Sequence, residues 1–222
     1  AATGAAVALY PLRSAASAIT PSVALLPSFA ETRIGALAHF VTIILALDLA
    51  YYFGHRLLHM STNLWRIHAV HHTDLDLDVT TNLRHHPLEV LLFTAIVVGV
   101  GALLGSSPGE MVGYSVLAFG VQLLAHANVA LPTWAESTIG GLLVTPAFHR
   151  FHHSRDEHEC HANFGEVFIF WDRLFHTAIL PKTPAPAAFG VRQYLEPRYR
   201  VHPPLASHAG RDESAAGTED GP

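Results

Sequence analysis

Residues 34–58 read IGALAHFVTIILALDLAYYFGHRLL, an almost continuous apolar run with His55 near its end and His59 directly after it. A helix of these 25 residues, at about 1.5 Å per residue, can cross a hydrocarbon core of roughly 30 Å. The spacing of four residues puts both imidazoles on one helical face, which Asp48 shares. We therefore predict a transmembrane helix that presents two imidazoles at one membrane surface.

Two further apolar runs follow, at residues 88–104 and 111–131, and only the sequence GSSPGE separates them. Pro108 and Gly109 in this connection favour a tight reversal of the chain. The two runs predict a helical hairpin, in which 88–104 is at the lower length limit for crossing a membrane. We therefore predict an all-α fold, an integral membrane helical bundle with a helical cap.

The polar segments divide the chain into regions. Residues 1–33 form an N-terminal segment whose prolines interrupt any long helix, and residues 34–200 form the membrane-embedded domain. Residues 201–222 form a polar tail that we expect to be disordered. Lysine and arginine gather in residues 60–87 and 145–200, while the hairpin turn has neither. The positive-inside bias then predicts that the histidine-rich cap is cytoplasmic.

Composition excludes several classes of protein. Half of the residues (50%) are apolar, 14% are charged, and the formal net charge is -5. Because the sequence has no dense basic cluster, we exclude nucleic acid as a partner. The single cysteine, Cys160, can form neither an internal disulfide nor a thiolate metal site. A disulfide-stapled secreted scaffold and a zinc ribbon are therefore excluded.

Histidine is the residue type that composition does not explain, since 13 of the 17 histidines lie between residues 55 and 161. HRLLH is followed by RIHAVHH and, much later, by FHRFHH, in which histidines recur at spacings of three and four. One helical turn can thus present three imidazoles to a shared centre, and imidazole suits iron, zinc, copper or nickel. Eight histidines in three boxes exceed what one ion with an open position can take, so we predict two metal ions.

A ninth histidine, His126, lies near the end of the third apolar run, where the hairpin returns the chain to the surface that it left. It can reach the same centre, and Gln122, one turn earlier, faces the same way. Polar side chains within an apolar span are costly unless they are paired or functional. His39 lies 16 residues before His55, about 24 Å along a helix, so we expect a structural role for it.

The boxes HRLLH, HAVHH and HRFHH, with RHHPLE, AHAN, NFG and WDRLF, resemble the sterol desaturase and fatty acid hydroxylase superfamily of membrane di-iron enzymes. The resemblance covers roughly residues 34–180, and the family usually has a glycine where this chain has His176. It implies an O2-dependent oxidation of an unactivated C–H bond of a lipid at a histidine-ligated pair of irons. Matched position by position, it implies that the metal ligands are His55, His59, His68, His71, His72, His126, His149, His152 and His153.

Other polar residues are predicted to support these ligands, because a ligating imidazole usually donates its second N–H to a carboxylate or carbonyl group. The alternative for the carboxylates and amides is ordinary helix capping or solvent exposure, and for two of the histidines it is an accidental surface position. For His85 and His86 the role stays open. The candidate supporting residues are Asp48, Gln122, His86, Asn128, His158, His161, Asn163, Glu166 and Asp172.

We predict an oxidoreductase that hydroxylates or desaturates a sterol or fatty-acyl lipid, which enters from the bilayer between the second and third spans. The two outcomes differ only in the placement of the substrate carbon. The expected cofactors are two iron ions, with zinc as a possible substitute in purified protein. Since the sequence carries no haem, flavin or nicotinamide motif, electrons must come from a separate partner, a ferredoxin or a cytochrome b5-like protein.

Two alternatives compete with this prediction. A membrane zinc hydrolase would also use imidazole ligands, but HRLLH lacks the glutamate that follows the first histidine of an HExxH motif. A metal transporter or store would need ligands along a path through the bilayer, whereas the boxes lie at the ends of the spans. Metal analysis of the purified protein would discriminate among the three.

Overall fold

The computed structural model describes residues 32–181 and 186–191, so the predicted disordered tail lies outside the described residues. The regular structure within these ranges is helical, apart from isolated β-bridges at Leu143–Phe168 and Ser154–Phe189. The prediction of an all-α fold is therefore confirmed for the described part of the chain.

Three long helices form the frame, and each begins or ends at a residue that suits its position. Helix α3 (Arg33–Met60) starts after Thr32, whose hydroxyl accepts from the third backbone N–H of the helix. Helix α5 (Pro87–Leu104) begins with proline and ends at Gly105, which has a φ of 71°. Helix α6 (Pro108–His126) opens with a capping box between Ser107 and Glu110.

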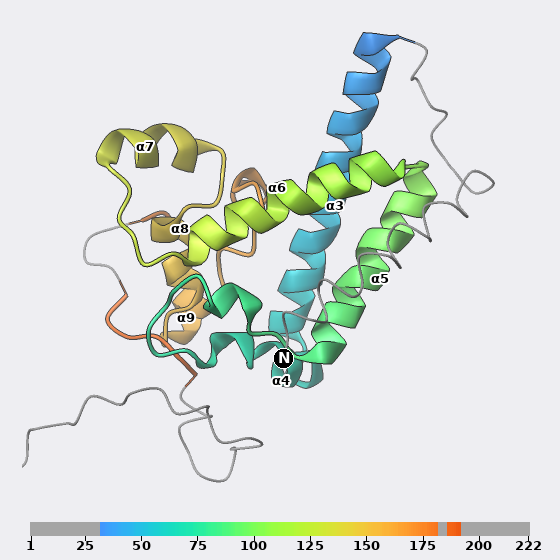
Figure 1. Cartoon of the computed structure of the whole chain (residues 1–222). Helices are drawn as coiled ribbons and strands as arrows, with labels where there is room; N and C mark the ends of the chain where they lie inside the picture. Colours follow the sequence, from blue (N-terminus) through green and yellow to red (C-terminus); the bar gives the residue numbers. More distant parts are fainter. Residues whose placement is uncertain (1–31, 182–185, 192–222) are drawn as a thin grey trace, which may run out of the picture. The chain divides into compact units, whose positions relative to one another are not determined.

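Short helices connect and cover this frame. They are α4 (Thr62–His68), η2 (His71–Thr73), η3 (Thr81–Leu83), α7 (Thr133–Thr138), η4 (Ile139–Gly141), α8 (Pro146–His152), α9 (Glu157–Cys160) and α10 (Phe170–Leu174). Most of them lie in the polar segments that the sequence assigned to a cap, and α4, η2 and α8 carry five of the box histidines (Figure 1 shows the helices).

Among the described residues, α3 and α5 are the helices that are both long and apolar enough to cross a membrane. The third predicted span, 111–131, is corrected by the structure, because α6 ends at His126 and the next residue, Ala127, is extended. Helix α6 also carries the polar side chains of Glu110, Gln122 and His126.

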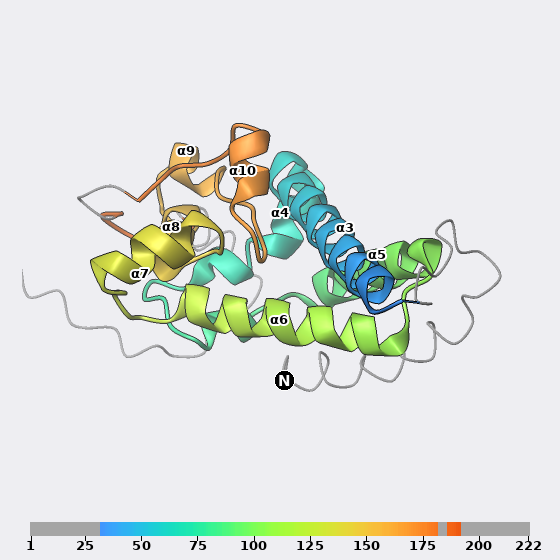
Figure 2. The ribbon, with the colours of Figure 1, turned by 90° about the horizontal axis from the view of Figure 1, so that it is seen from above.

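The predicted hairpin is also modified. Helices α5 and α6 separate from the turn at Gly105, and each packs on α3. Figures 1 and 2 show α6 lying across α3, whereas α5 runs closer to the direction of α3. The end of α6 nevertheless reaches the histidine-bearing helices, because α6 contacts α8.

The apolar core joins the long helices to the last part of the described chain. It combines one face of α3 and α6 with residues around α8 and the segment that precedes α10. Its buried members are Ile43, Leu47, Val97, Met111, Tyr114, Ala118, Val121, Ala125, Val144, Phe148, Val167 and Ile169. Burying this set fixes α8 and the segment after it against the histidine ends of α3 and α6.

Candidate metal centre

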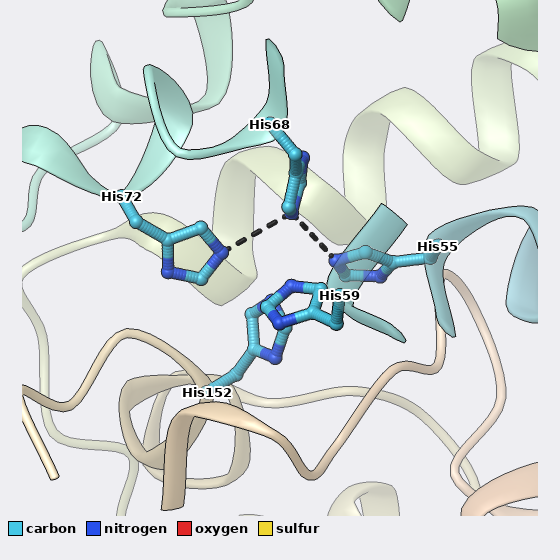
Figure 3. A group of neighbouring side chains, drawn as sticks. All are labelled: His55, His59, His68, His72 and His152. Carbon is cyan, nitrogen blue, oxygen red and sulfur yellow. Dashed lines mark hydrogen bonds between the residues drawn. The ribbon is translucent and has the colours of Figure 1, made fainter. Parts of the chain in front are cut away.

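The structure gathers the nine histidines that the sequence singled out into two buried groups. Within each group, one nitrogen of every imidazole lies within 4.8 Å of the corresponding nitrogens of the others. The first cluster, drawn in Figure 3, consists of His55, His59, His68, His72 and His152. The second cluster consists of His71, His126, His149 and His153.

The two clusters are neighbours, because residues adjacent in sequence belong to different clusters. His71 and His72 divide between them, and so do His152 and His153. The ring of His153 stacks on that of His72 with centroids 4.5 Å apart, and it lies 4.6 Å from the ring of His71. The nine imidazoles thus form one continuous buried layer with two centres.

Local sequence explains how each helix delivers its imidazoles. His55 and His59 are one turn apart near the end of α3, so both project from the same face. Helix α8 starts at Pro146, with the side chain of Thr145 accepting from Phe148, and it is only seven residues long. Within so short a helix, the spacing of three and four residues places three imidazoles on the side that faces α3 and α6.

The outward nitrogens of several imidazoles are held by acceptors. His55 Nδ1 lies 3.0 Å from the carbonyl oxygen of Phe164, and His152 Nδ1 lies 2.7 Å from that of Ala162. In the second cluster, His126 Nδ1 lies 2.8 Å from the carbonyl oxygen of Gln122. A carbonyl only accepts, so each Nδ1 carries the proton and each Nε2 presents a lone pair. The acceptors therefore set the tautomer that a metal ligand requires.

The inward nitrogens of the rings lie close together. In the first cluster, Nε2 of His68 lies 3.0 Å from Nε2 of His55 and 3.1 Å from that of His72 (Figure 3). Both nitrogens of His59 and Nε2 of His152 are buried without a hydrogen-bond partner in the described structure. Lone pairs facing one another in a buried site repel unless a cation lies among them, so this donor set fits a metal ion.

Burial favours the neutral form of the late histidines His152 and His153. It lowers the pKa of His152 and His153 well below the usual value of 6.5, and neighbouring imidazoles lower it further. The neutral ring is the form that binds metals. Both clusters are built from histidine alone, which suits a transition metal and is a poor match for calcium or magnesium.

Glu89 is a candidate functional residue that sequence reasoning did not single out. One oxygen of this buried carboxylate lies 2.8 Å from Nδ1 of His68 and 2.9 Å from Nδ1 of His85. The ring of His85 in turn stacks on His71, with centroids 4.4 Å apart. The sequence does contain a signal for Glu89, because it is a carboxylate in the first turn of an apolar run. Burying an ionisable side chain at such a position is costly in free energy unless it has a partner.

Three of the predicted supports act through the backbone rather than on an imidazole. Asp172 accepts hydrogen bonds from the N–H groups of Phe164 and Gly165, each at 2.8 Å. Asp48 accepts from the N–H of Val167 at 2.9 Å, and the Asn163 side chain braces the same segment. These side chains hold the segment whose carbonyl groups accept from His55 and His152. They therefore act on the imidazoles through the backbone, whereas the sequence predicted direct contacts.

The other predicted supporting residues make different contacts, outside both clusters. Gln122 donates from its side chain to the Glu166 carbonyl group, while its own carbonyl group accepts from His126. His86 caps α5, with Nδ1 accepting from the Leu88 N–H, and Asn128 accepts from Arg150. His158 and His161 are exposed, although the ring of His161 lies 5.4 Å from that of His59. None of these joins either cluster.

A pocket of about 170 Å³ lies between α3, α5 and α6, where α5 and α6 diverge. Helix α5 begins and α6 ends beside the histidines, so the polar lining residues lie at the end nearest the clusters. We call Asn82, His85, Glu89, Gln122 and Glu166 the polar end of the pocket. The remaining lining is mainly apolar or aromatic and consists of Tyr51, Leu83, Val90, Phe93, Val97, Tyr114, Ser115, Ala118 and Phe119.

The polar end of the pocket touches the layer of nine imidazoles directly. Glu89 contacts His68, the ring of His85 stacks on His71, and the Gln122 carbonyl group accepts from His126. A molecule in the pocket would therefore lie one side chain away from both clusters.

Comparison with known proteins agrees with this geometry. Residues 40–177 match the family model described as fatty acid hydroxylase. The chain is 33% identical over 140 residues to the ornithine lipid hydroxylase OlsE of Rhizobium tropici, which covers 63% of this chain and 41% of that protein.

It is also 30% identical over 136 residues to the human alkylglycerol monooxygenase, covering 60% of this chain and 29% of that protein. The chain is 31% identical over 130 residues to the very-long-chain aldehyde decarbonylase GL1-8 of Oryza sativa subsp. japonica. This alignment covers 59% of this chain and 48% of that protein. The chain thus spans less than half the length of each of these relatives. No solved structure matches the chain. On the match over most of its described length, the chain belongs to the fatty acid hydroxylase family.

Proposed function

We propose that this protein is an O2-dependent membrane oxidoreductase that hydroxylates or desaturates a lipid, with one iron ion in each histidine cluster. Bound iron would supply the activation of O2 and the oxidation of an unactivated C–H bond. The imidazoles of the two clusters would hold the ions as neutral donors. Glu89 and the carbonyl groups of Ala162, Phe164 and Gln122 would hold those imidazoles in the required tautomer.

The observation that carries this proposal is the pair of adjacent clusters built from imidazole alone. A zinc hydrolase with a single ion uses three protein ligands and a general base, and within the described residues neither cluster includes a carboxylate. A transporter needs ligands spread along a path. Here the ligands on α3 and α6 lie near the ends of those helices, in one layer with those of α8.

The pocket supports a lipid substrate. Its apolar walls come from α3, α5 and α6, and the first two of these are the helices suited to crossing a membrane. Phe119, which lines the pocket, is 51% exposed, and Leu91 on α5 is 57% exposed. We infer that these side chains meet lipid and that an alkyl chain enters between α5 and α6 from the bilayer.

The partners and the orientation follow from the same proposal. The family resemblance implies that electrons arrive from a ferredoxin or a cytochrome b5-like protein. The concentration of basic residues around the cap favours a cytoplasmic position for the clusters and hence for that donor. Two relatives are named as a hydroxylase and a monooxygenase, which favours insertion of oxygen over desaturation.

Metal analysis combined with turnover tests this proposal. The full chain is purified without a histidine tag, its metals are counted, and it is incubated with lipid extract, reduced ferredoxin and isotopically labelled O2. We expect two irons per chain and labelled oxygen in a lipid product detected by mass spectrometry. Stoichiometric zinc with hydrolysis of a lipid would support the zinc hydrolase instead. Tight metal binding without oxidation or hydrolysis would favour storage or transport.

A further inference from the structure

The polar end of the pocket contains a carboxyl group that the metal centre does not use. Glu166 directly follows Gly165, whose N–H donates to Asp172, and it borders the pocket, where it is partly exposed. Among residues 32–181 and 186–191, no group forms a hydrogen bond or ion pair with the Glu166 carboxyl group, although its backbone carbonyl group accepts from Gln122. Its side chain therefore has an unmet hydrogen-bonding capacity directed at the pocket.

The backbone at this position is fixed from several sides, so the point from which the Glu166 side chain extends is well defined. Gln122 of α6 holds the Glu166 carbonyl group, and Asp48 of α3 holds the N–H of Val167. The Val167 carbonyl group also accepts from the N–H of Val144 at 3.0 Å. Two long helices and the segment before α8 thus place one carboxyl group at the polar end of the pocket.

Chemistry decides what this group can bind. Burial raises the pKa of the Glu166 carboxyl well above its usual range, and the Asp48 and Glu89 carboxyl groups raise it further. A neutral carboxyl group carries an O–H donor, whereas an ionised one only accepts. The natural complement of Glu166 is therefore an acceptor oxygen without a formal charge, because an anion would be repelled by Glu89.

We propose that Glu166 is a specificity-determining residue that donates a hydrogen bond to an ether or carbonyl oxygen of the lipid, and so fixes which carbons lie beside the metal centre. This inference rests on the proposed function. It narrows the substrate class to lipids with such an oxygen within the chain that enters the pocket, and it disfavours a plain hydrocarbon chain. The apolar walls would bind the alkyl segments on either side, and Glu166 would set their register.

A matched pair of probes tests this. Dioctyl ether and n-heptadecane have chains of equal length and differ only in one central oxygen. Phe119→Cys in the full chain places a thiol at the exposed edge of the pocket, while the native Cys160 is buried. The protein is reconstituted in phosphatidylcholine nanodiscs, and the measurement is the concentration of each probe that slows maleimide labelling of the introduced cysteine.

We expect dioctyl ether to protect at a concentration about three- to tenfold lower than n-heptadecane, the difference typical of one hydrogen bond. Glu166→Met should abolish this difference, and Glu166→Gln, which keeps an N–H donor, should retain part of it. Ser115→Ala is the control, because the Ser115 hydroxyl also lines the pocket but donates to the Met111 carbonyl group. It should leave the preference unchanged.

Three results would overturn the inference. They are equal protection by both probes when Glu166 is present, an undiminished preference in Glu166→Met, and the lack of protection by either probe. A water molecule that satisfies Glu166 would give the first result. Because labelling requires no turnover, failure of lipid oxidation would count against the proposed function and leave the probe preference standing.

Discussion

At the scale of single residues, the chemistry of the site depends on which nitrogen of each imidazole faces inward. Backbone carbonyl groups fix His55, His126 and His152 with Nδ1 pointing outward, and the Glu89 carboxylate does so for His68. If the clusters bind metal as proposed, metal affinity would depend on acceptors that are not ligands, through the orientation and basicity of the ring.

His126 and His39 both lie in long helices, yet we expect them to respond differently to substitution. His126→Ala should lower the iron content and abolish turnover, because an apolar wall cannot replace a ligand nitrogen. His39 lies far from both clusters, and its Nδ1 is 2.7 Å from a carboxylate oxygen of Glu110. His39→Ala should therefore leave the iron content nearly unchanged. This substitution should lower the free energy of unfolding by about 1–3 kcal/mol, because the Glu110 carboxylate loses its hydrogen-bond partner.

The measurements are metal analysis of each purified variant and its thermal unfolding. Equal iron content in His126→Ala and the parent protein would remove His126 from the proposed ligand set.

His176 is a second residue with a specific consequence. Its φ is 56°, in the left-handed region, which agrees with the glycine that the family usually has at this position. His176→Gly should increase the free energy of unfolding by roughly 1 kcal/mol, because glycine adopts this conformation without steric cost. His158 is exposed and lies within helix α9, so His158→Gly should have the opposite sign. Thermal unfolding of the two variants checks both signs, and a lower melting temperature for His176→Gly would contradict the argument.

Spacing along a helix carries part of the information about the site, and the binding of metal by these residues stays a prediction. Histidines three and four apart on a helix are readable as a set, and all nine lie in the two clusters. Glu89 and the carbonyl groups of Ala162 and Phe164 were not predicted. A backbone carbonyl group has no sequence signature, and its position depends on tertiary contacts that bring residues 162–168 to α3.

At the scale of elements, the segment 162–168 between α9 and α10 acts as a brace for the first cluster. Asp48 from α3 and Asp172 from α10 both accept from its N–H groups. Gly165 lies at the tightest point, since a Cβ there would meet the Phe168 carbonyl oxygen at 2.6 Å and the Asp172 carboxylate at 3.0 Å. The segment therefore has no room for a side chain at this position.

Gly165→Ala should decrease the free energy of unfolding by about 1–3 kcal/mol and should lower metal occupancy, because it displaces the carbonyl group that holds His55. Gly99→Ala is the matched control. Gly99 lies within α5, and a Cβ there meets nothing within 4 Å, so this substitution should be neutral or slightly stabilising. Thermal unfolding and metal analysis of both variants test this, and equal behaviour would refute the role given to the segment.

For the long helices, the sequence predicted their positions in the chain better than their packing directions. Apolar length was enough to find α3 and α5, since both are continuous apolar runs. The direction of α6 was not readable, because periodicity reports which residues share a face but not the angle at which that face packs. Pro108 and Gly109 indicated a reversal correctly, whereas the divergence that opens the pocket comes from packing of both helices on α3.

At the scale of the whole molecule, neutral buried imidazoles make folding dependent on pH. Burial lowers the pKa of His72 and His153 well below 6.5, whereas in the unfolded chain both have ordinary values. Below about pH 6.5 the unfolded chain therefore binds more protons than the folded chain. The stability that these groups contribute is present above this pH and is lost as the pH falls.

We expect the metal-free protein to lose stability progressively as the pH falls below about 6.5, with the iron-loaded protein resisting until protons displace the metal. Thermal unfolding of chelator-treated and loaded protein across this range measures both effects. A melting temperature of the metal-free protein that rises on acidification would contradict the burial of neutral imidazoles.

The alternation of neighbouring histidines between clusters has a consequence for assembly during synthesis. The first cluster requires His152, and the second requires His71 from the early part of the chain and His153 from the late part. Neither centre can be completed until α8 has left the ribosome and docked, and that single docking event completes both. A chain loaded at only one centre should accordingly be a rare species, because whatever displaces His152 also displaces His153.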